Sequence, residues 1–215
     1  MNMIIRKAEV RDAEAFLKIK EELKMPLVQE TAQGGFLLGT TLKQYQFYIE
    51  NAFVRVLEDS DKARIVGFSI ILPDQVLRAS ELWEKREYIR WNEFDSSEFE
   101  GKKIAYYEQL AILPDAAYRR YSFLLAFSNA KDVIETGHEC MITTIVNYPV
   151  RNRAALPFLE AIGCVHVGEV EEKYPDVGRV HSDIYFVDKK RFVEKLQSHP
   201  IIKKVLIDLN EIMPE

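Results

Sequence analysis

The chain has 215 residues, of which 47% are hydrophobic and 29% are charged, a balance typical of a globular protein with a substantial core. Its formal net charge of −5 argues against a general nucleic-acid-binding protein, which normally carries a surplus of basic residues. No apolar run approaches the roughly 20 residues that cross a bilayer, and the N-terminus lacks the apolar core of a signal peptide. We therefore expect a soluble, cytoplasmic protein with no membrane partner.

Short strands and amphipathic helices follow one another over the first third of the chain. Alternating and helical hydrophobic patterns, separated by breaks rich in glycine and proline, indicate where these elements lie. They predict a strand over 3–8, a helix over 11–24, a loop over 25–39, a helix over 41–51 capped by Thr40 or Thr41, and antiparallel strands over 52–58 and 65–72.

The segment 74–103 departs from this rhythm. Its first part, "DQVLRASELWEKREYIRWNEF", has helical spacing, and "DSSEFEGKK" is typical of a polar loop. No linker rich in proline or glycine brackets the segment, so we expect an insertion into one domain, 1–188, rather than a second domain. Its aromatic residues either pack on the sheet or form a lid over a binding site or a dimer contact.

The second half of the chain supplies the remaining strands and helices. The patterns predict a strand over 104–113, a helix over 118–136, a strand that begins at Cys140, a helix over 152–162 capped by Asn152, strands over 164–169 and 182–187, and a helical C-terminal extension within 189–215. Some strands are hairpin neighbours and others are separated by helices. This order implies an α/β (α+β) fold with a mixed, mostly antiparallel central sheet flanked by helices.

The cysteines and histidines give no sign of a metal site. Cys140 and Cys164 lie in apolar runs, which favours two reduced core thiols over a disulfide. There is no CxxC pair, and the four histidines are scattered without the spacing of a ligand set or a catalytic triad. We expect no metal, and structural or surface roles for the histidines.

The stretch 104–134, "IAYYEQLAILPDAAYRRYSFLLAFSNAKDVI", is the most informative part of the sequence. An apolar strand leads through an arginine-rich turn into a helix. The first amides of a helix have no partner inside it, and the helix dipole favours negative charge there. Arg119 and Arg120 add guanidinium groups that match phosphate oxygens, although a solvated helix start is the alternative. This stretch predicts a phosphate-binding site.

Two motifs carry a likeness to a known family. The turn reads Arg119-Arg120-Tyr121-Ser122-Phe123-Leu124, and "NRAALPFLEAIGC" follows it with Asn152, Ala155 and Gly163. With the order of the elements, they resemble the GNAT superfamily of N-acetyltransferases over roughly residues 3–187. The resemblance implies the acyl-CoA N-acyltransferase-like fold.

This chain departs from the family's motifs at four positions. The family loop has the pattern Gln/Arg-x-x-Gly-x-Gly/Ala, in which Arg119 fits but Ser122 and Leu124 stand where small residues are usual. In the later helix, Leu159 replaces the usual tyrosine and Cys164 replaces the usual phenylalanine. Glycine lets the backbone approach a ligand closely, whereas the side chain of Leu124 adds bulk at this position.

The resemblance also implies a co-substrate and the residues that hold it. Acetyl-CoA would be the acetyl donor, its pantetheine paired with the backbone around Ala111, Ile112 and Leu113. Its pyrophosphate would lie against Arg119, Arg120, Tyr121, Ser122, Phe123 and Leu124, with Asn152 and Ala155 from the later helix nearby. The acceptor would be an amine of a small molecule or of a protein, and a homodimer is common among such proteins.

Transfer to an amine requires a base, because the amine must lose a proton to attack. Glu108, in the strand before the turn, is either this base in a substrate cleft or a structural or exposed residue. Strand alternation predicts Tyr106, Glu108 and Leu110 on one face. Because Leu159 removes the family's usual proton donor, the candidates for that role are Tyr148, Tyr121 and Tyr174, of which we take Tyr148 forward.

Two functions follow from these features. The first is an acetyl-CoA-dependent N-acetyltransferase that works by direct transfer, which Arg119, Asn152 and Glu108 favour. The alternative is a non-catalytic protein on the same scaffold that binds CoA or another ligand or serves assembly, which the altered motif positions favour. Turnover separates the two, whereas ligand binding alone does not.

Overall fold

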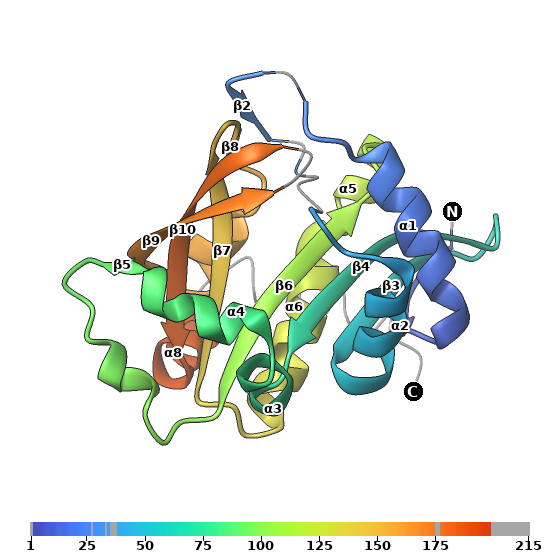
Figure 1. Cartoon of the computed structure of the whole chain (residues 1–215). Coiled ribbons are helices and arrows are strands. Elements are labelled where there is room, and N and C mark those ends of the chain that lie inside the picture. Colours follow the sequence, from blue (N-terminus) through green and yellow to red (C-terminus); the bar gives the residue numbers. More distant parts are fainter. Residues whose placement is uncertain (1, 27, 33, 35–37, 175–176, 199–215) are drawn as a thin grey trace.

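The computed structural model describes residues 2–26, 28–32, 34, 38–174 and 177–198, and its main feature is one large sheet with helices on both faces (Figure 1). The sheet has eight strands in the order β1-β3-β4-β6-β7-β10-β9-β5. In that order they are β1 (Met3–Lys7), β3 (Phe53–Asp59), β4 (Arg64–Leu72), β6 (Ile104–Ile112), β7 (Cys140–Tyr148), β10 (Gly178–Asp188), β9 (Val165–Tyr174) and β5 (Arg90–Trp91). Neighbours are antiparallel except β6 and β7, which run parallel.

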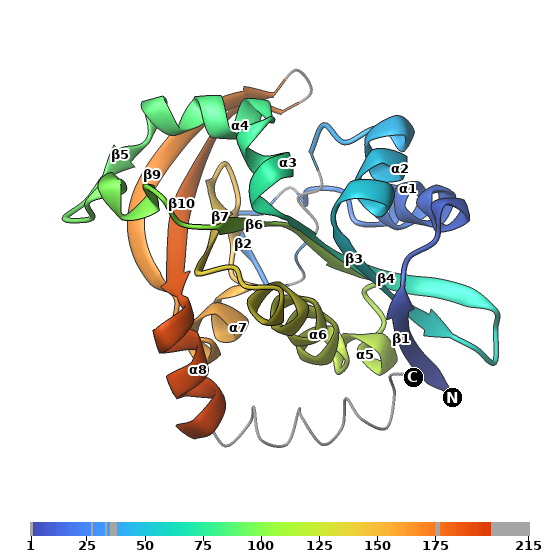
Figure 2. The same ribbon diagram turned by 90° about the horizontal axis from the view of Figure 1, so that it is seen from below.

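The helices cover the two faces of this sheet, as Figure 2 shows from below. One face carries α1 (Ala13–Glu22), α2 (Leu42–Asn51), α3 (Asp74–Arg78) and α4 (Glu81–Glu84); the other carries α5 (Ala116–Arg119), α6 (Ser122–Glu135), α7 (Leu156–Ala161) and α8 (Lys189–Ser198). Short elements are β2 (Glu30–Thr31), which pairs with β8 (Arg151–Asn152), and the 3-10 turns Val10–Asp12, Lys85–Tyr88 and Ser96–Phe99. The predicted mixed, mostly antiparallel sheet flanked by helices is confirmed; the predicted extension after residue 198 lies outside the described residues.

Aromatic packing fixes α1 and α2 on the first face. The ring of Phe16 stacks on Phe68 of β4 at 4.2 Å between centroids and meets Tyr45 edge-on at 5.4 Å. All three side chains are fully buried. At the start of α2, the Thr41 hydroxyl accepts from the Gln44 amide, and Gln44 accepts from the Thr41 amide at 2.8 Å, so Thr41 is the cap.

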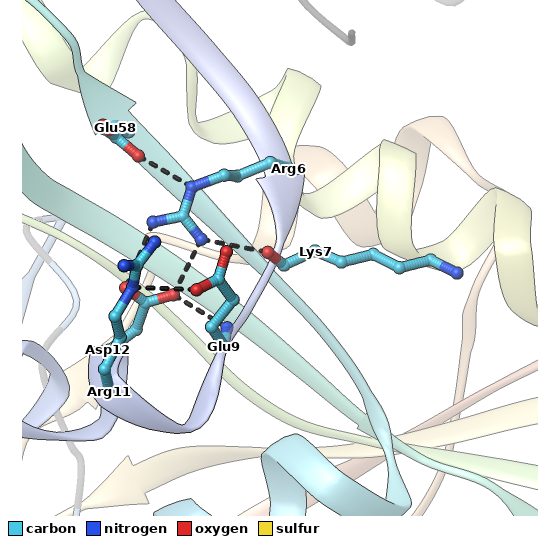
Figure 3. A network of polar contacts seen from close by, with 6 residues as sticks. All are labelled: Arg6, Lys7, Glu9, Arg11, Asp12 and Glu58. Carbon is cyan, nitrogen blue, oxygen red and sulfur yellow. Dashed lines mark hydrogen bonds and ion pairs between the residues drawn. The ribbon is translucent and has the colours of Figure 1, made fainter. Parts of the chain in front are cut away.

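A partly buried ion cluster ties the N-terminal strand to the start of α1 and to β3 (Figure 3). Arg6 donates to Asp12 Oδ2 at 2.8 Å and to Glu58 Oε2 at 2.7 Å, and the Glu9 amide donates to Asp12 at 2.8 Å. Burial opposes ionisation of Asp12, but the bonds from Arg6 and from the Glu9 amide outweigh it and hold the pKa of Asp12 below its usual value. This cluster fixes the sheet edge that lies far from β7.

The helix predicted over 118–136 is two helices in the structure. Asp115 caps the first by accepting from the Ala117 amide at 2.8 Å, so α5 begins earlier than expected. The backbone then turns at Tyr121, with φ −91° and ψ −1°, before α6 begins. Gly137, at φ 88°, follows the end of α6 in the left-handed region that glycine favours.

The helix predicted over 152–162 is also shorter. Asn152 belongs to β8, where its side chain accepts from the Ala154 amide at 3.0 Å, and it does not cap the helix. The helix α7 begins only at Leu156 because Pro157 fits a first helical turn but not a helix interior. The predicted stop at Gly163, with φ 85°, is observed.

The last two strands are longer than predicted. The acidic residues that follow the predicted strand over 164–169 continue β9 to Tyr174, opposite Gly178 of β10. Cross-strand ion pairs compensate their charge, for example Arg179 with Glu171 at 3.0 Å.

Residues 74–103 pack on the central sheet and add a strand to its edge. Their aromatic side chains pack together and on β10, with Phe94 4.9 Å from Phe186 and 5.4 Å from both Trp91 and Phe99 between ring centroids. The segment also contributes β5, which extends the sheet beyond β9. It thereby forms a wall over the first face beside β6 and β7 (Figure 2).

Both cysteines are free; Cys140 is buried and Cys164 is partly buried. Within the described residues, every helix is too short or too polar to span a bilayer.

Candidate active site

The parallel strands β6 and β7 separate at the centre of the sheet. Their register ends at Tyr107 opposite Thr143, whose hydroxyl donates to the Tyr107 carbonyl at 2.8 Å. Beyond this point β6 stays paired with β4 and β7 with β10, so a gap opens between the two halves of the sheet. A cavity of about 350 Å³, here called the main cavity, occupies this region. Its walls come from β6, β7, β9, the start of α6 and the segment before α7.

A β-bulge places Glu108 in the wall of the main cavity. Gln109 pairs with Ile70 of β4 and Tyr107 pairs with Ile71, so Glu108 is an extra residue without an opposite partner. The bulge breaks the predicted alternation, because Leu110 pairs with Ser69 on the α6 face instead of sharing a face with Tyr106. Gln109 stabilises the bulge by donating to Thr40 at 2.7 Å and accepting from Tyr45 at 3.1 Å.

The surroundings of Glu108 make its carboxyl group a weaker acid than an ordinary glutamate. Burial raises its pKa to about 7, and the charge of Glu172 across the cavity adds to this effect. A hydrogen bond with Gln109 and the charge of Lys85 act in the opposite direction. A carboxyl group with this pKa is a suitable proton acceptor near neutral pH.

The raised pKa of Glu108 predicts a pH-dependent stability. The folded pKa of about 7 exceeds the ordinary value of 4.5 for a glutamate, so wild-type stability is lost as pH rises through this window. Glutamine does not titrate, so Glu108→Gln should match wild type at pH 4.5 and be more stable at pH 8. After discounting for the open cavity we expect about 1 to 2 kcal/mol, or roughly 2 to 8 °C in Tm.

Thermal melts of both proteins from pH 4.5 to 8 measure this difference. A constant difference across the range would mean that Glu108 has an ordinary pKa.

The second acid at this end of the cavity is Glu172 of β9. Its carboxylate accepts from Lys85 at 2.7 Å and from the Tyr174 hydroxyl at 3.4 Å. Burial, with the charge of Glu172, raises the pKa of Tyr174, which therefore stays protonated. Lys85 comes from the 74–103 segment, so the two halves of the site are joined by this ion pair.

The opposite end of the main cavity lies at the start of α6. Arg119, Ser122 and Phe123 line it, and no side chain within the described residues caps the first amides of α6. Arg119 donates to the carbonyl of Ala32 and still faces the cavity. A helix of 14 residues with uncapped amides beside a guanidinium group favours an anion.

The structure divides the predicted site residues into two groups. Those that line the main cavity are Glu108, Ala111, Ile112, Arg119, Ser122, Phe123, Asn152 and Ala155. Leu113, Arg120, Tyr121 and Leu124 are not among its lining residues. Leu124 is buried, with 8% of its surface exposed, so its bulk does not fill the cavity.

Arg120 turns away from the main cavity. It donates to the Tyr121 hydroxyl at 2.8 Å, and its guanidinium lies 4.8 Å from the centre of that ring. The predicted arginine pair is therefore split between one cavity residue, Arg119, and one surface residue.

The structure places Tyr148 outside the main cavity. Its side chain is 55% exposed at the end of β7, and its ring lies 5.5 Å from that of His181. Of the three tyrosines considered as proton donors, Tyr174 lines the main cavity instead. Sequence patterns missed this because Tyr174 reaches the site through the pairing of β9 with β10, far from the motifs.

His166 has acidic neighbours that its sequence position did not indicate. Its ring and the carboxylates of Glu169 and Asp183 have ligand atoms within 4.8 Å of one another. Protein groups already engage both acids, since Arg90 donates to Glu169 at 3.2 Å and Asn147 to Asp183 at 3.1 Å.

Comparisons with known proteins identify the fold. No family model and no curated protein matches the sequence. Among solved structures, an N-acetyltransferase from Staphylococcus aureus Mu50 has a TM-score of 0.58 at 13% identity, over 88% of this chain and 99% of that chain. Mosquito arylalkylamine N-acetyltransferase like 5b has a TM-score of 0.58 at 17% identity, over 87% and 100%. A putative acetyltransferase from Salmonella typhimurium, with its cofactor acetyl-CoA, has a TM-score of 0.56 at 14% identity, over 88% and 95%. The chain therefore has the fold of the GNAT N-acetyltransferases.

Proposed function

We propose that the chain is an acetyl-CoA-dependent N-acetyltransferase of the GNAT superfamily that acts by direct transfer on an amine of a small molecule or protein. One observation carries this proposal: a single cavity joins the uncapped start of α6, beside Arg119, to a carboxyl group with a pKa of about 7, Glu108. The first feature suits a pyrophosphate and the second suits deprotonation of an amine. The neighbour from Salmonella typhimurium has acetyl-CoA as its cofactor, which supports the choice of donor.

The residues of the main cavity fit this donor. The amides of Ser122 and Phe123 and the guanidinium of Arg119 would hold the pyrophosphate. The backbone of Ala111 and Ile112, on the side of β6 that β7 leaves unpaired, would pair with the pantetheine amides, opposite Asn152 and Ala155. When bound, acetyl-CoA supplies the acetyl group as a reactive thioester.

Protein groups then handle the protons. Glu108 accepts a proton from the bound ammonium, directly or through one water, which frees the amine for attack. Tyr174 is the candidate donor to the departing sulfur, because its hydroxyl is protonated and lies in the same cavity. The apolar walls around Leu110 and Phe158 limit water.

Leu159 favours the alternative of a non-catalytic binding protein. It lines the main cavity with 3% of its surface exposed and brings no proton donor to the wall. Tyr174 is the residue that would compensate for it.

Ligand binding and turnover test the two candidates in sequence. We expect acetyl-CoA and CoA to raise Tm by mass action, whereas adenosine leaves it unchanged. Thiol release from acetyl-CoA with a panel of amines then measures turnover. A Tm shift without thiol release would support the binding protein, and no shift at millimolar acetyl-CoA would refute both.

Alanine substitutions at the two arginines of the turn are expected to have unequal effects on CoA affinity. Arg119→Ala should raise the Kd for CoA about tenfold, because it removes a charged donor from the cavity. Arg120→Ala is the matched control and should stay within about twofold, since that guanidinium stacks on Tyr121. Isothermal titration of CoA measures both Kd values. An equal loss of affinity in the two variants would contradict the placement of the pyrophosphate at Arg119.

A further inference from the structure

A second, smaller pocket adjoins the acidic end of the main cavity. This side pocket has a volume of about 60 Å³ and lies between residues 74–103 and the sheet. Its lining is mainly apolar and includes Leu77, Leu82 and Trp83 on one side and Ile142, Val170 and Ile184 on the other. Leu82, Tyr106, Thr144 and Glu172 line both cavities, so the two spaces meet there.

The polar side chains that line both cavities are each engaged by another protein group. The Tyr106 hydroxyl and Thr144 Oγ1 lie 2.7 Å apart, and the Glu172 carboxylate is paired with Lys85 at 2.7 Å. Tyr106 and Thr144 are therefore hydrogen-bonded to each other, and neither brings a charge to the junction. Glu108 supplies the charge that meets a cation on the side of the main cavity.

The outer wall of the side pocket is held in place. The guanidinium groups of Arg78 and Arg86 lie 4.5 and 4.6 Å from the Trp83 ring centre. Arg78 is itself fixed by Asp74 at 2.8 Å. The cations nearest the pocket are thus engaged by Trp83, Asp74 and Glu172.

We propose that the acceptor is a primary monoamine with one compact apolar group close to its nitrogen, and that this group occupies the side pocket while the amino group meets Glu108. This inference rests on the proposed acetyltransferase function. At about 10 to 15 Å³ for each water-sized group, the 60 Å³ of the pocket holds roughly four to six such groups, equivalent to a branched alkyl chain or a small ring. A second ammonium group in this pocket would lose its hydration without a free partner, so diamines are disfavoured. A lysine side chain is disfavoured because its long stem and the attached peptide exceed a pocket of this volume.

Tryptophan fluorescence can report whether the side pocket is occupied. The chain has two tryptophans, and both Trp83 and Trp91 line this pocket. Titration with 3-methylbutylamine, with and without CoA, should give a saturable change in tryptophan fluorescence. Titration with 1,4-diaminobutane should give a change at least tenfold weaker in apparent affinity. This readout requires no turnover.

Changes at Ile142 test the position of the apolar group, because this residue lines the side pocket but not the main cavity. Ile142→Phe fills the pocket and should weaken 3-methylbutylamine binding at least tenfold, with ethylamine turnover within about twofold of wild type. Ile142→Ala enlarges the pocket and should shift the kcat/KM preference towards 2-phenylethylamine. If Ile142→Phe does not fold, the change in kcat/KM preference of Ile142→Ala is the test of the side pocket.

The outcomes separate the two proposals. A fluorescence response that Ile142→Phe abolishes supports the side pocket, even if no amine is acetylated and the proposed function fails. Acetylation with kcat/KM for 1,4-diaminobutane or a lysine peptide equal to that for 3-methylbutylamine overturns the inference and leaves the proposed function intact. A response unaffected by either Ile142 variant also overturns it.

Discussion

Glu108→Gln is expected to lower kcat for acetyl transfer by about 10²- to 10³-fold, the range that loss of a general base produces. The amide keeps the size of the side chain but cannot accept the ammonium proton. Because the proposed pyrophosphate end of the main cavity lies at Arg119 and Ser122, the Kd for acetyl-CoA should stay within about twofold. Initial rates of thiol release and calorimetric titration measure the two quantities.

The pH profile gives the same variant a second signature. In wild type, kcat/KM should increase as pH rises through about 7, because Glu108 must be deprotonated to act as the base. The variant should lack this acidic limb and keep any limb that belongs to the amine itself. Glu169→Gln is the matched control, since Glu169 pairs with Arg90 at the far edge of the sheet. Wild-type rates and an unchanged acidic limb in Glu108→Gln would exclude Glu108 as the base.

The elements of the fold could be predicted from the sequence, because hydrophobic periodicity reports which face of a segment is buried. The strands β1, β4 and β6 and the helices α1 and α2 lie close to their predicted ranges. The errors occur where local interactions redirect the backbone. The Asn152 side chain accepts from the Ala154 amide and does not cap a helix at this position. The helix α7 begins only at Leu156, because Pro157 is confined to a first helical turn.

The site was predictable only in part, and for a different reason. Arg119 and Ser122 follow from the strand–turn–helix pattern, because the start of a helix is a local feature. Glu172 and Tyr174 enter the main cavity through the pairing of β9 with β10, which no local pattern reports.

The bulge at Glu108 shows the limit of strand periodicity. A single extra residue reverses the face of every side chain that follows it, and the sequence gives no sign of it. The same bulge removes Glu108 from the ladder and places it in the cavity wall. The deviation from the regular strand pattern therefore lies at the proposed base.

Asn129→Asp is expected to destabilise the fold by at least about 4 kcal/mol at pH 7, since it removes a buried donor and introduces a buried charge. Asn129 is fully buried in α6 and joins this helix to the sheet. Its Nδ2 donates to the Phe53 carbonyl at 3.0 Å, the Ser69 carbonyl at 3.1 Å and Ser69 Oγ at 3.0 Å. An ionised carboxylate would face these acceptors without any proton to donate.

Urea denaturation at pH 7 and at pH 4.5 measures the effect of Asn129→Asp and separates its two causes. Burial raises the pKa of the new carboxyl group, and its protonated form regains one donor, so the deficit should shrink at the lower pH. Lys131→Ala on the same helix is the control, because it breaks only an exposed pair with Glu135 and should cost less than about 0.5 kcal/mol. An equal, small loss in both variants would show that the Asn129 bonds do not hold α6 on the sheet. A large loss confined to Asn129→Asp would tie the position of the α6 start, and with it the proposed pyrophosphate site, to this buried amide.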